Sequence, residues 1–179
     1  MGPAPPMSRH RLIIDGYNVM HAAPEYRMLM EHDIDAARAR FIGDLTSLAH
    51  DEGRVTVVFD GGGNPASDGA PHHIGGLAIV FSPAGMTADT VIEALAQRAR
   101  ERGEPAMVVT SDRATRDAVR SGTVAVRSSE SFAADVRGSL SETTLGGRSS
   151  RKGTVATRID PEVSRTLARW AQGERPERR

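Results

Sequence analysis

The chain of 179 residues contains no cysteine. It therefore cannot form disulfides, thiolate zinc sites or a cysteine nucleophile. Lysine occurs only once, at Lys152, which removes every mechanism that needs a lysine in the core. No GxxxxGK motif followed by Ser or Thr is present, so a P-loop nucleotide site is excluded.

Aromatic residues and long apolar runs are also scarce. With only four Phe, two Tyr and one Trp, the chain does not support an extended stacking platform for bases. No apolar run approaches the ~20 residues that span a bilayer. The first ten residues lack the basic start and apolar core of a signal peptide, so we expect a flexible leader over 1–10 and a cytoplasmic protein with no membrane partner.

The formal net charge is zero, but the two signs are distributed unevenly. Residues 137–179 carry ten Arg and Lys against five Asp and Glu, and residues 1–136 carry thirteen against eighteen. An acidic body with a basic tail suits an enzyme that acts on a polyanion. A solvated extension explains the tail more simply, and we expect residues 139–179 to form a basic linker with a short C-terminal helix, partly disordered.

Hydrophobic runs that end in an aspartate recur along the chain. Asp15, Asp60 and Asp112 each follow a run that is typical of a buried parallel strand. Asp89 lies instead in the first turn of a predicted helix, where Thr87 is a plausible N-cap. The pattern therefore predicts acids at one edge of a sheet.

Strands and helices alternate in the sequence. We predict strands over residues 11–15, 54–60, 77–81, 106–111 and 123–126, and helices over 24–30, 33–51, 87–102, 113–120 and 129–138. Residues 61–73, rich in glycine, are expected to form a loop, and a last short helix begins near Asp160. This alternation predicts an α/β domain over residues 11–138, with a mainly parallel sheet of about five strands covered on both faces.

Ligands of such sheets bind beyond the carboxyl ends of the strands, where these aspartates are predicted to meet. Carboxylates that converge repel one another unless a proton or a cation neutralises them, which favours Mg²⁺ or Mn²⁺. Each acid also has a structural interpretation. Asp15 could close its turn, Asp89 could complement the helix dipole, Asp112 could be an N-cap and Asp60 could order the glycine loop. Four acids at one edge favour the functional interpretation.

Other residues at this edge could contact a substrate. Gly16 permits close backbone approach to a ligand, and the amide of Asn18 could bind a phosphate oxygen or a metal-bound water. Tyr17 could stack on a base or pack within the domain. Ser111 and Arg113 flank Asp112, and Arg113 could bind a phosphate.

Four segments appear in a fixed order: Asp15-Gly16-Tyr17-Asn18-Val19, Val57-Val58-Phe59-Asp60, Thr87-Ala88-Asp89 and Thr110-Ser111-Asp112-Arg113. Together they resemble the YacP-like branch of the NYN domains, relatives of the PIN-domain nucleases, over about residues 11–137. The resemblance implies a PIN-like three-layer α/β/α sandwich and metal-dependent RNA cleavage. It implies a metal site of Asp15, Asp89 and Asp112 with Asn18 and Asp60 nearby, and a link to RNA turnover, including messages on the ribosome.

The resulting hypothesis is an endoribonuclease that uses Mg²⁺ or Mn²⁺. Asp15, Asp89 and Asp112 would hold the ion and activate water, Asn18 would orient water or phosphate, and Asp60 would act indirectly or through a second ion. The alternative is a non-catalytic RNA-binding or ribosome-binding module. An aspartyl phosphatase is disfavoured because it needs a second acid where Tyr17 stands and a core lysine. The sequence leaves open the RNA target, endonucleolytic or exonucleolytic action, and whether the chain is a monomer or a homodimer.

Overall fold

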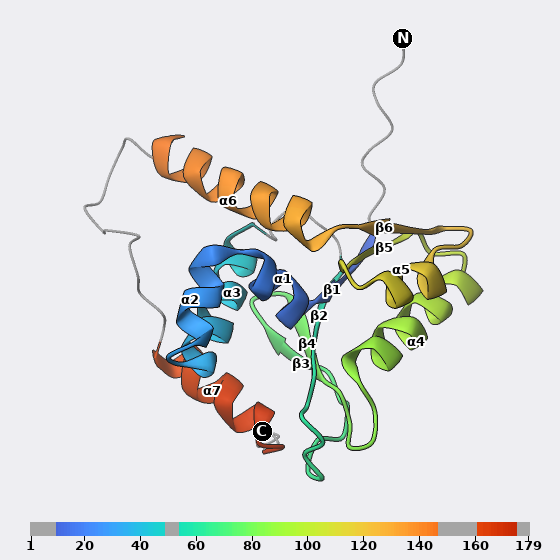
Figure 1. Ribbon diagram of the computed structural model, residues 1–179, viewed down its shortest axis with the longest axis horizontal. Coiled ribbons are helices and arrows are strands. Elements are labelled where there is room, and N and C mark those ends of the chain that lie inside the picture. The colour runs from blue at the N-terminus through green and yellow to red at the C-terminus, as the bar shows by residue number, and fades with distance from the viewer. Residues whose placement is uncertain (1–9, 49–53, 147–160, 175–179) are drawn as a thin grey trace.

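A six-stranded sheet forms the centre of the molecule in the computed structural model, which describes residues 10–48, 54–146 and 161–174 (Figure 1). The strands are β1 (Arg11–Asp15), β2 (Val55–Phe59), β3 (His72–Ile74), β4 (Leu77–Phe81), β5 (Ala106–Val109) and β6 (Val124–Arg127). Their order is β3-β4-β2-β1-β5-β6, and every neighbouring pair except β3 and β4 is parallel. The predicted α/β fold with a mainly parallel sheet is confirmed, with six strands in place of about five.

Helices cover both faces of the sheet (Figure 1). On one face lie α1 (Gly16–Ala22), α2 (Pro24–Met30), α3 (Ile34–Leu48), α6 (Ser129–Gly146) and α7 (Pro161–Ala171), and on the other lie α4 (Ala88–Glu101) and α5 (Arg113–Val119). The central strands alternate between two cores: Ile14 packs under the first group of helices and Ile13 under the second, and both are fully buried.

β3 lies within the segment predicted to be a loop, so the prediction for residues 72 and 73 was wrong. His72–Ile74 pairs with β4 through a two-residue turn at Gly75 and Gly76, whose φ angles are 53° and 85°. Two consecutive positive φ angles are the signature of a tight hairpin turn, and glycine supplies them without steric cost. The glycine-rich loop is therefore shorter than predicted, and we use that name for residues 61–71.

The first turn of α1 also differs from the prediction, because residues 16–18 form a helix and not an isolated turn. Asp15 is its N-cap residue, and the shared position makes β1 pass directly into α1. Gly16 has no room for a side chain, since a Cβ there would lie 2.4 Å from the Phe59 ring. The close approach that glycine allows at this position is thus to the core.

The C-terminal part of the described chain packs on the domain. α6 continues to Gly146, so the boundary predicted at residue 138 falls inside it. α7 packs on α3 and adds Leu167 and Trp170 to the core. The predicted helix end at 49–51, the leader over 1–9 and the linker over 147–160 lie outside the described residues. In the described ranges, no helix is sufficiently long and apolar to cross a membrane.

Candidate active site

The sheet edge at the carboxyl ends of β1 and β5 is surrounded by helix beginnings. In Figure 1 the first turns of α1, α4, α5 and α6 gather near the centre of the view. Asp15 and Asp112 are the N-cap residues of α1 and α5, and Asp89 lies in the first turn of α4 behind its N-cap Thr87. The strand-helix alternation thus brings together three of the acids predicted to form the site.

Asp15 is the buried acid of this group. Its side chain is 8% exposed and accepts hydrogen bonds from the Asn18 N–H at 3.4 Å and the Thr110 hydroxyl at 3.3 Å. Its pKa is raised from 3.8 to about 6, chiefly by loss of solvation and to a smaller extent by the nearby charges of Asp89 and Asp112, while the two hydrogen bonds act in the opposite direction. Ionisation of Asp15 is therefore unfavourable in the metal-free protein, and a bound cation would make it more favourable.

Asp112 lies in a different environment. Its carboxylate accepts two hydrogen bonds from Thr115, from the backbone N–H and from the hydroxyl, both at 2.8 Å. These bonds lower the pKa of Asp112, so it remains ionised beside an acid whose pKa is raised. Neighbouring carboxylates with pKa values displaced in opposite directions are typical of functional sites.

The side chain of Asn18 makes hydrogen bonds within the fold that could not be predicted from the sequence. Its Oδ1 accepts the Ser111 N–H at 2.8 Å and the Ser129 hydroxyl at 2.6 Å. The Ser129 N–H in turn donates to the Ser111 hydroxyl at 2.9 Å. We call these three residues the polar clasp. The clasp joins the starts of α1, α5 and α6 and occupies the oxygen of the amide that we predicted to bind a phosphate oxygen or a metal-bound water.

Ser129 and Glu130 are site residues that sequence reasoning missed. Ser129 is fully buried, and Glu130 accepts a hydrogen bond from the Ser111 hydroxyl. This hydrogen bond is the main reason that the pKa of Glu130 is lowered, with a smaller contribution from Arg116. Both residues follow β6 as Asp112 follows β5. A search for polar residues directly after every predicted strand, and not for aspartates alone, would have identified them.

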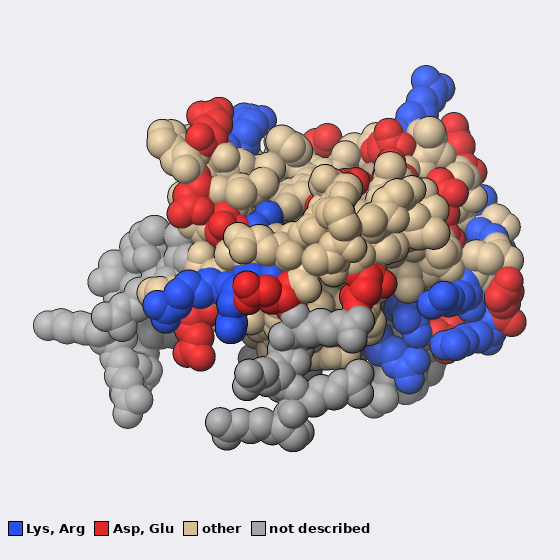
Figure 2. Space-filling model, turned by 90° about the horizontal axis from the view of Figure 1, so that it is seen from below, with Lys and Arg blue, Asp and Glu red and all other residues tan. Residues whose placement is uncertain are grey.

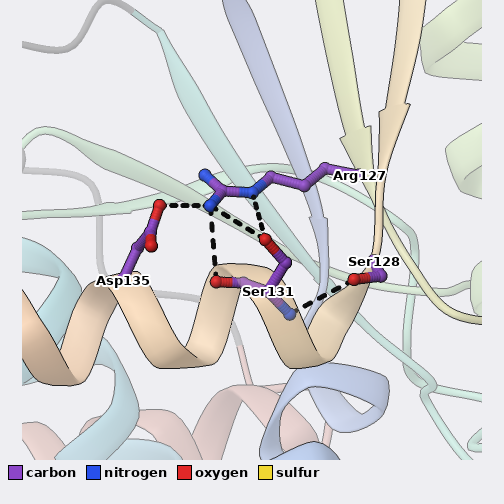
Figure 3. A network of polar contacts seen from close by, with 4 residues as sticks. All are labelled: Arg127, Ser128, Ser131 and Asp135. Atoms are coloured by element: carbon purple, nitrogen blue, oxygen red, sulfur yellow. Dashed lines mark hydrogen bonds and ion pairs between the residues drawn. The ribbon is translucent and has the colours of Figure 1, made fainter.

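The start of α6 is fixed by a second polar network (Figure 3). Arg127, at the end of β6, donates to the Ser131 hydroxyl at 3.1 Å and forms an ion pair with Asp135. The Ser128 hydroxyl accepts the Ser131 N–H at 3.2 Å. These contacts hold the edge strand against the first turns of α6 and thereby position Ser129 and Glu130.

Asp60 lies at the same edge but uses its carboxylate within the fold. One oxygen accepts the Gly62 N–H at 2.8 Å and the other accepts the Ala88 N–H at 3.3 Å. The arrangement agrees with the interpretation that Asp60 orders the glycine-rich loop and joins it to α4. A ligand role for Asp60 stays a prediction.

Tyr17 packs within the domain and is partly exposed. Its ring lies 5.0 Å from the Phe59 ring, and its hydroxyl accepts a hydrogen bond from Arg38 at 2.6 Å. Arg38 is 4% exposed and also pairs with Asp35. Arg113, by contrast, is exposed at the start of α5, where a phosphate could reach it. Its predicted phosphate contact is untested.

The carboxylates at this sheet edge fit the way in which Mg²⁺ is bound by proteins. Within the described residues, no three His, Asp or Glu side chains are grouped closely enough to enclose an ion by themselves. Mg²⁺ does not require such a group, because it retains several waters and is often bound through one or two carboxylates. The buried Asp15, with Asp89 and Asp112 near enough to raise its pKa, fits that mode of binding.

A three-layer α/β/α sandwich with acids at the carboxyl ends of its parallel strands defines a PIN-like domain. The chain belongs to the family of the YacP-like NYN domain, whose model matches residues 12–172. The match therefore extends beyond residue 137, where the sequence resemblance was expected to end. Membership of this family supports an RNA-related nuclease role.

Solved structures share the fold. The chain is similar to the crystal structure of Rae1 (YacP) from Bacillus subtilis, with 24% identity, a TM-score of 0.58, and coverage of 90% of this chain and 94% of that chain. A mutant of the same protein gives 23% identity, a TM-score of 0.60, and coverage of 86% and 89%. No curated protein matches the chain.

Proposed function

We propose that the protein is a divalent-metal-dependent endoribonuclease that hydrolyses single-stranded or messenger RNA. The observation that carries the proposal is Asp15, a buried acid whose pKa is raised to about 6 beside two further acids. A structural role alone does not require a carboxylate that is both buried and repelled by its neighbours, whereas a cation would offset the loss of solvation and the smaller repulsion. The family of the chain supports the same activity.

Asp15, Asp89 and Asp112 are the residues that would hold the ion, and Glu130 is a fourth candidate at the same edge. A bound Mg²⁺ or Mn²⁺ would supply a water of lowered pKa and would neutralise charge on the scissile phosphate. Asp15 must be ionised to hold the cation, and because its pKa is raised to about 6 in the metal-free protein, a proton competes with the cation below that pH. Arg113, exposed beside Asp112, would bind a non-bridging phosphate oxygen.

The polar clasp gives Asn18 a positioning role in this proposal. By accepting the Ser111 N–H, Asn18 fixes the turn that carries Asp112. Ser111 likewise positions Glu130 through its hydroxyl. Base contact by Tyr17 remains a prediction from the sequence, and association with a ribosome remains a prediction from the family resemblance.

The test is cleavage of end-labelled single-stranded RNA with Mg²⁺, Mn²⁺ or chelator. Asp89→Asn should abolish cleavage and leave the melting temperature nearly unchanged, because Asp89 is partly exposed in a helical turn already capped by Thr87. Glu93→Gln is the matched control, since it removes an exposed carboxylate one turn further along α4. Full activity of Asp89→Asn would contradict the site assignment.

Internal fragments that appear before terminal mononucleotides would establish endonucleolytic action. If the wild-type protein binds RNA but cleaves none with either metal, the non-catalytic RNA-binding module is the correct alternative.

A further inference from the structure

A groove of about 530 Å³ lies between α4 and the half of the sheet that α4 leaves uncovered. It forms because α4 packs over β1, β2 and β5 and α5 packs against β6. The face of β4 next to β2 is therefore open along one side of α4. The walls are mainly apolar and are formed by Thr56, Ala78 and Val80 of the sheet and by Val91, Ala94 and Leu95 of α4.

One end of the groove is positively charged. Arg11, Arg54 and Arg98 line it. In Figure 2, which shows the molecule from below, blue side chains with some red ones among them gather on the right, the side where Figure 1 places α4 and α5. Glu104 forms ion pairs with both Arg11, at 3.1 Å, and Arg54, at 3.8 Å, so one negative charge balances two positive charges only in part. Within the described ranges, Arg98 makes no ion pair. This end therefore holds an excess of positive charge, which suits an anionic ligand.

The other end opens beside the candidate active site. Met86 and Thr90 line it, and Thr90 follows Asp89 directly in the first turn of α4. Met86 is 50% exposed. From Thr90 to Arg98 the helix rises by about 12 Å. A ligand in the groove would thus extend from the acids of the sheet edge to the arginines.

We propose that this groove binds the single-stranded RNA that continues from the scissile phosphate, an inference that rests on the proposed function. Phosphates contact Arg98 and Arg54, while sugars and bases lie against the apolar walls. An apolar peptide would fill the walls but leave the excess positive charge without a partner, so RNA satisfies both parts of the groove. No Phe, Tyr or Trp lines the groove in the described part of the chain, and the imidazole of His73 is the one ring there that could stack on a base.

The first test measures the binding of 20-nucleotide single-stranded RNA in chelator over a range of salt concentrations. Arg98→Ala should weaken binding several-fold and lower the slope of log K against log salt by about 0.7, the value for one lost contact to a single strand. Arg102→Ala, at the end of the same helix and outside the groove, should leave the slope unchanged. Equal slopes for the two variants would overturn the inference.

The second test uses the absence of cysteine from the chain. A bulky uncharged maleimide attached to Ala94→Cys fills the groove, and the same label on Ala118→Cys, exposed on α5, is the control. The wild-type protein does not react. The label at position 94 should weaken RNA binding at least several-fold, and the label at position 118 should not. Unchanged binding with position 94 labelled would assign the groove to another occupant, such as an acidic partner protein.

Cleavage assays with Mg²⁺ on the same variants separate this inference from the proposed function. RNA cleavage that survives both changes with unaltered affinity overturns the groove and leaves the nuclease assignment intact. Groove-dependent binding without cleavage supports the groove and overturns the nuclease assignment.

Discussion

Asp15 serves two purposes at the residue scale. As the last residue of β1 and the N-cap of α1, it accepts the Asn18 N–H, which an asparagine in its place could also do. As a buried charge near Asp89 and Asp112, it is unfavourable in the metal-free protein. The capping role explains why an acceptor stands at this position, and only the proposed metal site explains why that acceptor is charged.

Ser129→Ala tests the polar clasp at a single hydroxyl. The change removes the 2.6 Å hydrogen bond to Asn18 in a fully buried position and should lower the free energy of unfolding by about 1–2 kcal/mol. Cleavage should fall by at least about tenfold, because the start of α6 and the turn before Asp112 lose a shared anchor. Urea denaturation and the RNA assay measure both effects.

Ser131→Ala is the control for this change, as Ser131 lies on the same helix with an exposed hydroxyl bonded to Arg127 (Figure 3). Its loss should alter the free energy of unfolding by no more than about 0.5 kcal/mol. Equal effects of the two substitutions would show that the polar clasp contributes no more to stability than an exposed hydrogen bond on the same helix.

The site acids were predictable from sequence because each follows a recognisable hydrophobic run or begins a helix. Ser129 and the role of Asn18 were not, because a hydroxyl and an amide have many local uses and their partner lies 111 positions away. For Asp60 the sequence pattern suggests more than the structure displays. Its position after β2 predicts a metal ligand, yet both of its carboxylate oxygens accept backbone N–H groups.

At the scale of elements, α7 and the glycine-rich loop depend on each other. The Asn64 side chain donates to the carbonyl of Ala171 at 3.0 Å, and the rings of His72 and Trp170 stack at 4.5 Å. Gly173 lies against Ala66 so closely that a Cβ would approach the Ala66 Cβ to 2.4 Å. The loop directly follows Asp60, whose carboxylate accepts the Ala88 N–H at the start of α4. α7 is thus linked to the site through the loop.

Gly173→Ala should separate α7 from the loop. Gly173 has a φ of 84° and Gly103 a φ of 63°, but a Cβ at Gly103 meets no atom within 4 Å. Gly103→Ala should therefore cost only the conformational penalty, about 1–2 kcal/mol. Gly173→Ala should cost at least about 1 kcal/mol more because of the contact with Ala66. Thermal melting compares the two variants.

Amide hydrogen exchange identifies where the additional loss falls. Exchange over residues 61–71 should accelerate in Gly173→Ala and remain at the wild-type rate in Gly103→Ala. Unchanged exchange in both variants would show that α7 does not hold the loop.

Most elements followed from periodicity and capping. Thr87 caps α4 as predicted, and Asp33 accepts the Ala36 N–H at the start of α3. β3 was missed because a three-residue strand at the edge shows no period, and its partner β4 supplies the pairing. The site could therefore be assembled from sequence only as far as the strand ends, because the packing of α6 and α7 depends on long-range contacts.

At the scale of the whole molecule, Asp15 makes stability depend on pH. Its pKa is higher in the folded protein, about 6 against 3.8, so the folded state binds the proton more tightly. Its contribution to stability is full below pH 3.8, falls as the pH rises toward 6, and is lost above 6. At about 1.4 kcal/mol for each pKa unit, the loss reaches about 3 kcal/mol at most.

Asp15→Asn should therefore stabilise the metal-free protein at pH 8 by up to about 3 kcal/mol and change little at pH 4, while abolishing cleavage. Mg²⁺ or Mn²⁺ should raise the melting temperature of the wild-type protein at pH 8 but not that of the variant. Calorimetry in chelator and in metal measures both effects.

Asp117→Asn, an exposed change on α5, is the control and should leave the stability at both pH values nearly unchanged. A variant Asp15→Asn that is less stable than the wild-type protein at pH 8 would contradict the electrostatic account of the site.

The contacts between α7 and the glycine-rich loop also have a consequence for the order of synthesis. A ribosome makes β1 and its aspartate first and α7 last, so the loop lacks its support until residues 161–173 have left the exit tunnel. All the acids of the sheet edge therefore leave the ribosome before the segment that supports the glycine-rich loop, and the contacts between α7 and the loop are among the last to form.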